Sequence, residues 1–210
     1  MKDKQATEIN IVTPTRADIS GVVLSGGQAR RMGCADKGLL SFRGRPLVSY
    51  ALDALGEVAE SRLISANRNL EGYAALGFPV ISDASNNFDG PLAGLLSAMR
   101  VVATPFVLTV PCDAPLLTGP LLQRLALRLM EAGAVIAVAA DGERLHPVVM
   151  LAETRLADDL QAYLDAGERK VEHWIRRHHW VSVDFSDAGV ALVNINTPDD
   201  LTRFDTQGSR

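Results

Sequence analysis

The sequence predicts an α/β protein, built as a doubly wound, three-layer α/β/α sheet of the Rossmann-like type, mostly parallel with one antiparallel strand. Three observations support this prediction. Short apolar runs alternate with helical patterns along most of the 210 residues. Several of these runs end in glycine or proline, which is typical of strand-to-helix loops. One Asp-Gly pair, Asp141-Gly142, marks a hairpin and therefore an antiparallel strand.

The expected elements of the first half begin with a buried strand. Residues 19–25 form an apolar run that ends at Gly26-Gly27, which indicates a strand followed by a loop. Pro46 stands at the first position of a helical pattern that extends to residue 54. The same criteria predict strands at 62–66, 78–81 and 106–110 and helices at 90–102 and 118–133.

The second half contains the expected hairpin. Strands at 134–140 and 145–151 flank the Asp-Gly pair, and two helices follow at 153–166 and 168–178. We expect a final strand at 190–194 and a closing helix from Pro198. In domain terms, residues 1–18 lack periodicity and are expected to form a flexible leader, and residues 19–208 a single domain.

The composition excludes several classes of protein. With 47% hydrophobic and 22% charged residues, the chain has the composition of a soluble globular protein. Its two cysteines, Cys34 and Cys112, form no Cys-x-x-Cys pair, so we expect neither a disulfide framework nor a thiolate metal site. A net charge of −4 argues against nucleic-acid binding, and no apolar run reaches the length of a membrane span. We therefore expect a cytoplasmic protein with neither a membrane nor a nucleic acid as partner.

The loop after the first strand has the features of a phosphate-binding loop. Gly26 and Gly27 allow backbone N–H groups to converge on an anion, and Arg30, Arg31 and Lys37 supply positive charge. A plain glycine turn with solvated basic residues is the alternative. The spacing matches neither the Walker A motif nor the G-x-G-x-x-G dinucleotide motif, so neither a P-loop NTPase nor a classical dehydrogenase is supported.

A carboxylate follows another expected strand at the same edge of the sheet. Asp113 comes just after the apolar run 106–110, and ligands of such sheets bind beyond the carboxyl ends of the strands. A carboxylate there can hold Mg²⁺ together with substrate phosphates and water. Taken alone, Asp113 would more simply cap a turn before Pro115. Opposite a phosphate loop, we favour the metal role.

These motifs together resemble one family. The loop from Leu24 to Lys37 is similar to the signature loop of nucleotidyltransferases that use a nucleoside triphosphate. Further segments narrow the resemblance to molybdenum cofactor guanylyltransferases of the MobA type: Gly90-Pro91-Leu92-Ala93-Gly94, Pro111-Cys112-Asp113, Asp141-Gly142-Glu143-Arg144, Ala166-Gly167-Glu168-Arg169 and Asn194-Ile195-Asn196-Thr197-Pro198. They occur in the order of the family from about residue 20 to 205.

The resemblance implies an activity and a set of site residues. The activity is the transfer of GMP from GTP to the terminal phosphate of Mo-molybdopterin, with Mg²⁺ as cofactor and pyrophosphate released. A GTP-binding half is implied at about 19–115 and a molybdopterin-binding half at about 116–208. The binding residues are Leu24, Ser25, Gly26, Gly27, Lys37, Ser65, Asn67, Asp83, Gly90, Pro91, Asp113, Asn194 and Asn196. Ser65 departs from the family, which has an asparagine there.

The catalytic residues that we expect are Arg31, Lys37 and Asp113. Asp113 would hold Mg²⁺ against the nucleotide phosphates, while Arg31 and Lys37 would neutralise charge on the α-phosphoryl group and the departing pyrophosphate. Asp83 offers a carboxylate to the N–H groups of guanine. Asn194 and Asn196, on one face of the expected final strand, would bind the pterin, although one of them is also placed to cap the closing helix.

The alternatives lie in the same family and outside it. The cytidylyltransferase branch shares the glycine loop and the Pro-Cys-Asp segment. A catalytically silent adaptor that binds GTP and carries the pterin is a candidate from another class. We also expect a monomer that makes transient contacts with molybdopterin-supplying and molybdoenzyme-maturation proteins.

Overall fold

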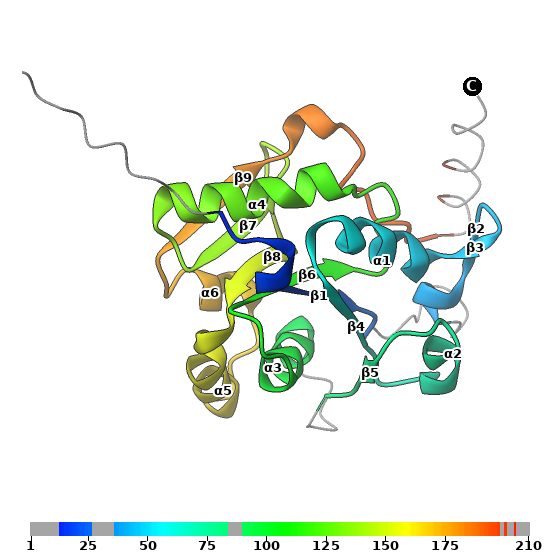
Figure 1. Ribbon diagram of the computed structural model, residues 1–210, viewed down its shortest axis with the longest axis horizontal. Helices are drawn as coiled ribbons and strands as arrows, with labels where there is room; N and C mark the ends of the chain where they lie inside the picture. Colours follow the sequence, from blue (N-terminus) through cyan, green and yellow to red (C-terminus); the bar gives the residue numbers. More distant parts are fainter. Residues whose placement is uncertain (1–12, 27–35, 84–89, 198–199, 201–203, 205–210) are drawn as a thin grey trace, which may run out of the picture.

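A central sheet covered by helices on both faces organises the protein (Figure 1). The computed structural model describes residues 13–26, 36–83, 90–197, 200 and 204. Within them the main sheet has seven strands in the order β5-β4-β1-β6-β8-β7-β9. The strands are β1 (Ile19–Leu24), β4 (Ser61–Ser65), β5 (Val80–Ile81), β6 (Phe106–Pro111), β7 (Ile136–Ala140), β8 (Leu145–Glu153) and β9 (Trp180–Asp184). The predicted α/β fold class is confirmed.

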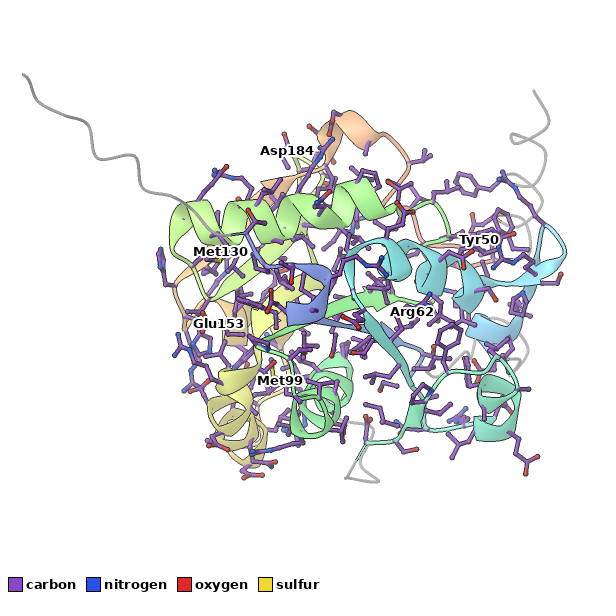
Figure 2. All side chains as sticks on the ribbon, viewed as in Figure 1. Tyr50, Arg62, Met99, Met130, Glu153 and Asp184 are labelled. Carbon is purple, nitrogen blue, oxygen red and sulfur yellow. The ribbon has the colours of Figure 1, made fainter. Side chains whose placement is uncertain are left out.

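Two helical layers enclose this sheet. Helices α1 (Leu47–Val58) and α4 (Gly119–Ala132) cover one face, and α3 (Pro91–Val101), α5 (Ala157–Asp165) and α6 (Val171–Ile175) cover the other (Figure 1). Consecutive residues of β1 point to opposite faces, as a strand requires. Val23 therefore packs in the core under α1 and α4, and Val22 in the core under α3 and α5. Side chains fill the space between the layers (Figure 2).

Smaller elements complete the fold beside α1. A two-stranded ribbon consists of β2 (Ser41–Phe42) and β3 (Arg45–Pro46), and a short helix, α2 (Leu70–Ala74), lies between β4 and β5. Single 3₁₀ turns are η1 (Arg16–Asp18), η2 (Lys37–Leu39), η3 (Thr154–Leu156) and η4 (Ser186–Ala188). None of these elements was expected from the sequence, because each is too short to show a period.

Strand β8 is the antiparallel strand that the Asp-Gly pair predicted. It runs antiparallel to both β6 and β7, whereas the other adjacent pairs of the sheet are parallel. A turn over residues 141–144 joins β7 to β8. The register then shifts: Val138 pairs with Met150 but Ala139 pairs with His146, so residues 147–149 form a bulge without partners in β7. Such bulges bend a strand and redirect its side chains.

The end of the chain differs from the prediction. The final strand expected at 190–194 is wrong: residues 189–192 form turns, and the last strand is β9, parallel to β7. The apolar residues Ala191 and Leu192 pack into the core under α4 without forming a strand. The helix expected at 168–178 is only α6, since the chain leaves the helix at Arg176 to enter β9. Residues 198 and 199, where the closing helix was expected to begin, lie outside the described residues.

The start of the chain is described from residue 13. Residues 1–12 of the expected leader lie outside the described residues. Arg16 to Asp18 form η1, and the carbonyl of Arg16 accepts a hydrogen bond from the Glu60 N–H at 2.9 Å. The described helices include none with the length and apolar character needed to span a bilayer.

Candidate active site

The carboxyl ends of three parallel strands meet at one edge of the sheet. The Ser25 N–H, just after β1, donates to the Ser65 carbonyl at the end of β4 (2.8 Å). The Cys112 N–H, just after β6, donates to the Leu24 carbonyl (3.2 Å). The loops that follow β1, β4 and β6 therefore lie side by side, as the expected topology required.

Lys37 and Asp113 meet at this edge although they are 76 positions apart in the sequence. The Lys37 ammonium forms an ion pair with Asp113 Oδ2 and donates a second hydrogen bond to Asn196 Oδ1 at 2.6 Å. Their side chains are only 19% and 13% exposed, so water screens the attraction less than at an open surface. The expectation that Lys37 and Asp113 meet at this edge is confirmed, while residues 27–35 of the basic loop lie outside the described residues.

The chain before the closing segment also reaches Asp113. The Ile195 N–H donates to the Asp113 carbonyl at 2.8 Å, which holds the segment of Asn194 and Asn196 beside β6. These two residues were expected on a strand, but residues 193–196 form neither a strand nor a helix. Tertiary contact with Asp113, and not strand pairing, thus brings Asn196 to the lysine.

Two polar side chains beyond β4 and β5 form a reciprocal pair. Asn67 Nδ2 donates to Asp83 Oδ2 at 2.7 Å, and the Asp83 N–H donates to Asn67 Oδ1 at 2.9 Å. A Cβ on Gly26 would lie 3.8 Å from Asn67 Nδ2, so the glycine loop begins beside this pair. The structure therefore brings Asn67, Asp83 and Gly26 together.

Ser65, Gly90 and Pro91 shape the start of α3. The Ser65 side chain is buried, and its Oγ would lie 2.6 Å from a Cβ placed on Gly94 of α3. Its side chain thus faces the helix, while its carbonyl accepts the Ser25 N–H. Gly90 has φ +75°, which favours glycine, and Pro91 is the first residue of α3. Two further predicted residues, Gly27 and Arg31, lie outside the described residues.

A cleft of about 380 Å³ opens next to Asp113. Pro111 and Ala114 form its side toward β6, and the bulged start of β8 forms the facing wall. Its remaining lining consists of Arg144, Leu145, His146, Pro147, Val148, Val149, Leu192, Val193, Asn194 and Asn196. Asn196 lines the cleft and also contacts Lys37, so the cleft and the lysine share one edge.

Comparison with known proteins identifies the family. The model of the MobA-like NTP transferase domain matches residues 21–182. This chain belongs to that family. It is 44% identical over 181 residues to the molybdenum cofactor guanylyltransferase of Shewanella woodyi, covering 86% of this chain and 92% of that protein. Over 188 residues it is 45% identical to the protein of the same name from Shewanella baltica, covering 90% and 96%.

Solved structures show the same fold. The molybdopterin-guanine dinucleotide biosynthesis protein A from Archaeoglobus fulgidus superimposes with a TM-score of 0.74 at 23% identity, covering 90% of this chain and 98% of that one. A nucleotidyl transferase from Methanothermobacter thermautotrophicus gives a TM-score of 0.67 at 21% identity, covering 90% and 96%. The family resemblance inferred from the motifs is confirmed.

Membership in the MobA-like family suggests a divalent metal, and Asp113 suits one. Its Oδ1 is buried without a hydrogen-bond partner among the described residues, so this oxygen is available to a cation. The described part of the chain contains no group of three or more His, Cys, Asp or Glu residues that could enclose a metal. Substrate phosphates and water would have to supply most of the ligands.

A buried thiol, that of Cys112, lies next to Asp113 in the sequence. Burial, and then the charge of Asp113, raise the pKa of Cys112 to about 12. A thiol with that pKa carries almost no thiolate near neutral pH, and the thiolate is the reactive form. Burial and this raised pKa both make Cys112 poorly suited to act as a nucleophile.

One wall of the cleft carries an organised carboxylate–imidazole pair. Asp141 Oδ2 lies 2.7 Å from His146 Nε2, and Asp141 Oδ1 accepts the N–H groups of Arg144 (2.9 Å) and Glu143 (3.0 Å). The hydrogen bond with His146, followed by those from the two N–H groups, lowers the pKa of Asp141 well below its usual range. Neither residue was among the site residues expected from the sequence, although His146 precedes Pro147 shortly after the Asp141–Arg144 segment that resembles the family.

Proposed function

We propose that this chain transfers GMP from GTP to the terminal phosphate of Mo-molybdopterin and releases pyrophosphate. The observation that carries the proposal is the position of Lys37, between Asp113 at the nucleotide edge and Asn196 in the cleft. The relatives named molybdenum cofactor guanylyltransferase, at about 45% identity over most of this chain, support the choice of substrates.

The nucleotide half would bind the triphosphate. Lys37 and Arg31 neutralise charge on the α-phosphoryl and pyrophosphate oxygens, assisted by the backbone of Gly26 and Gly27. Asp113 is the residue that would hold Mg²⁺, through an oxygen that has no other described partner. When bound, Mg²⁺ supplies further neutralisation of the phosphate charge.

Selection of guanine is assigned to Asp83 and Asn67. Guanine presents N1–H and N2–H₂ donors, so a selective site needs an acceptor such as a carboxylate. The reciprocal hydrogen bonds between the two side chains fix the carboxylate of Asp83 beside the glycine loop. A fixed acceptor favours guanine over bases that offer no donor at that position.

The cleft would receive the pterin. Its lining contains the amides of Asn194 and Asn196 and the imidazole of His146, which suit a polar ring system and its phosphate. An oxygen of the acceptor phosphate attacks the α-phosphorus, and the bond to the bridging oxygen breaks, so pyrophosphate leaves with that electron pair. A phosphate with a second pKa of about 6 is already ionised near pH 7, so no general base is required.

We also propose a compartment, an oligomeric state and partners for the protein. A buried free thiol at Cys112 suits a reducing compartment, and we place the protein in the cytoplasm. We propose that it acts as a monomer and meets the proteins that supply molybdopterin and mature molybdoenzymes only transiently.

A turnover assay tests the proposal. The protein is incubated with Mo-molybdopterin, Mg²⁺ and either GTP, CTP or ATP, and pyrophosphate and the dinucleotide product are measured. We expect product from GTP that requires both the acceptor and the metal and disappears with EDTA. Product from CTP alone would assign the chain to cytidylyl transfer, and binding of GTP without pyrophosphate release would support a silent adaptor.

A further inference from the structure

The segment that carries Lys37 is held by hydrogen bonds from α2 and from the residue that precedes it. Asp36 immediately precedes η2, which begins at Lys37. One oxygen of the Asp36 carboxylate accepts a hydrogen bond from the Tyr73 hydroxyl, and the other accepts one from Asn69 Nδ2 at 3.1 Å. Tyr73 lies in α2, and Asn69 is the residue immediately before this helix. Each oxygen of Asp36 is thereby held by a donor from the same element.

Two glycines allow η2 and α2 to approach closely. A Cβ on Gly38 of η2 would lie 2.5 Å from the Tyr73 hydroxyl oxygen, and a Cβ on Gly72 of α2 would lie 2.9 Å from Leu39 Cδ1. A larger residue at Gly38 would meet the buried Tyr73 side chain, whereas at Gly72 the obstacle is only the end of the Leu39 side chain. The close packing of Gly38 against Tyr73 is therefore a second contact between η2 and α2, besides the hydrogen bonds to Asp36.

Tyr73 is suited to act as a permanent donor. Its side chain is fully buried, and burial, followed by the hydrogen bond to Asp36, raises its pKa far above the usual range for tyrosine. The phenol therefore keeps its proton at any physiological pH. Asn69 has φ +47°, a left-handed conformation that asparagine adopts more readily than most residues, and this places its amide against Asp36.

We propose that Tyr73 and Asn69 are positioning residues, which hold Asp36 so that the Lys37 ammonium lies at Asp113 and Asn196. The inference rests on the proposed function, because it assigns these residues a role through the lysine expected to neutralise the triphosphate. Neither residue need touch a substrate. A lysine side chain has four rotatable bonds. The position of its ammonium relative to the phosphates therefore depends on how firmly the lysine backbone is held.

Tyr73→Phe tests the proposal because it removes one hydroxyl and leaves the ring in place. The matched control is Tyr163→Phe: Tyr163 is also buried, and its hydroxyl also donates a single hydrogen bond, to the Lys170 carbonyl at 2.9 Å. Tyr163 lies in α5, and none of its described hydrogen bonds involves residues 36–38. Asn69→Gly provides a second variant, since glycine keeps the positive φ and removes the amide.

The first measurement is amide hydrogen exchange, which needs no substrate. The Leu39 N–H donates to the Asp36 carbonyl (3.1 Å) and the Leu40 N–H to the Lys37 carbonyl (3.2 Å), so both amides report on the lysine segment. We expect faster exchange of these amides in Tyr73→Phe and Asn69→Gly than in Tyr163→Phe. Equal exchange in all three variants would overturn the positioning role.

The second measurement is turnover at saturating substrates, with Lys37→Ala as a background. We expect Tyr73→Phe to lower kcat about tenfold, the effect of losing a hydrogen bond to a charged group, while Tyr163→Phe stays near wild type. In Lys37→Ala, the further change Tyr73→Phe should have no effect, because the residue acts through the lysine. The same tenfold loss in that background would overturn the proposal.

Failure of the proposed function is a separate outcome. If the wild-type protein forms no pyrophosphate from any nucleotide, the guanylyl transfer proposal fails, and the exchange measurement alone decides whether Tyr73 and Asn69 hold the segment. If the wild type is active and Tyr73→Phe matches Tyr163→Phe in both measurements, the proposed function stands and the positioning role is overturned.

Discussion

The two halves of the sheet organise their polar groups differently. In the half formed by β5, β4, β1 and β6, all strands are parallel and the side chains at their ends bind one another: Lys37 with Asp113, Asn67 with Asp83, and Asp36 with Tyr73. In the half formed by β8, β7 and β9, one strand is reversed and a cleft opens at the same edge. The first half thus carries paired polar side chains at its strand ends, here called the network, and the second half carries a cleft.

This difference matches what each proposed substrate demands. A triphosphate is small and highly charged, so it is bound best by charges whose positions are fixed beforehand. A pterin is a larger polar ring, for which shape and a few hydrogen-bonding groups matter more than charge. Loss of a group from the network should therefore impair use of the nucleotide, in rate or in base choice, whereas loss of a group from the cleft should weaken binding of the acceptor.

Replacement of Asp113 should have the largest effect. Asp113→Asn keeps an oxygen for Lys37 but removes the charge that would hold the metal, and we expect kcat to fall on the order of a thousandfold. The control is Asp53→Asn, whose ion pair with Arg45 is exposed (60% and 50%) and should be dispensable. Steady-state turnover with GTP measures both. Normal turnover by Asp113→Asn would remove the metal assignment.

Lys37→Ala should reduce kcat about a hundredfold, because a positive charge that stabilises the developing phosphate charge is lost. Arg128→Ala serves as the control, since Arg128 pairs with Glu131 on the exposed surface of α4. The kinetic constants for GTP separate the possible roles. A higher KM with unchanged kcat would restrict Lys37 to binding of the ground state.

The pair beside the glycine loop should control base choice more than rate. We expect Asp83→Asn to lower the ratio of kcat/KM for GTP to that for ATP by about 30-fold, because the carboxylate acceptor for the guanine donors is lost. Asn67→Ala should change the same ratio in the same direction, since it orients Asp83. An unchanged ratio in both variants would place base recognition elsewhere.

Removal of a side chain from the cleft should affect only the acceptor. We expect His146→Ala to raise the KM for Mo-molybdopterin about fivefold, the effect of one lost hydrogen bond, with the KM for GTP unchanged. His173→Ala, an exposed histidine on α6, is the control. A rise in the KM for GTP would contradict the division between a charged network and a separate cleft.

The smallest expected effect is a change in the pH dependence of stability caused by the buried thiol of Cys112. Burial raises the pKa of the Cys112 thiol to about 12, whereas an ordinary thiol has a pKa near 9. The free energy of unfolding should therefore decrease as pH rises through this range. Urea denaturation of wild type and Cys112→Ala at pH 8 and pH 10.5 measures the effect. The decrease should be smaller in Cys112→Ala, and identical decreases would contradict the raised pKa.

Local pattern and topology together predicted most of the fold and the centre of the site. The apolar runs of β1 and β6 and the Asp-Gly turn identified the elements directly. The meeting of Lys37 and Asp113 then followed from a general property of parallel sheets, since their strand ends share one edge. Both predictions depend on features that a few adjacent residues display.

What escaped prediction depends on contacts between distant segments. The apolar residues 190–193 looked like a strand, but the preceding run, β9, pairs with β7 instead. The contacts of Asp36 with Tyr73 and Asn69 join residues more than 30 positions apart through a five-residue helix without a periodic signal. The wall of the cleft arises from a register shift, which no pattern of apolar residues encodes.

The bulge at residues 147–149 has a consequence for how this protein can change. Three regular pairs of β7 and β8, ending with Val138 opposite Met150, lie on one side of the bulge. Within the bulge, the Val148 carbonyl accepts a hydrogen bond from the Thr109 hydroxyl at 2.8 Å. Insertions or deletions in the turn at residues 141–144 would therefore leave the pairs that Ile136, Ala137 and Val138 form with β8 in place. A related enzyme could therefore accept a different molecule through changes in this turn, while Lys37 and Asp113 keep their positions.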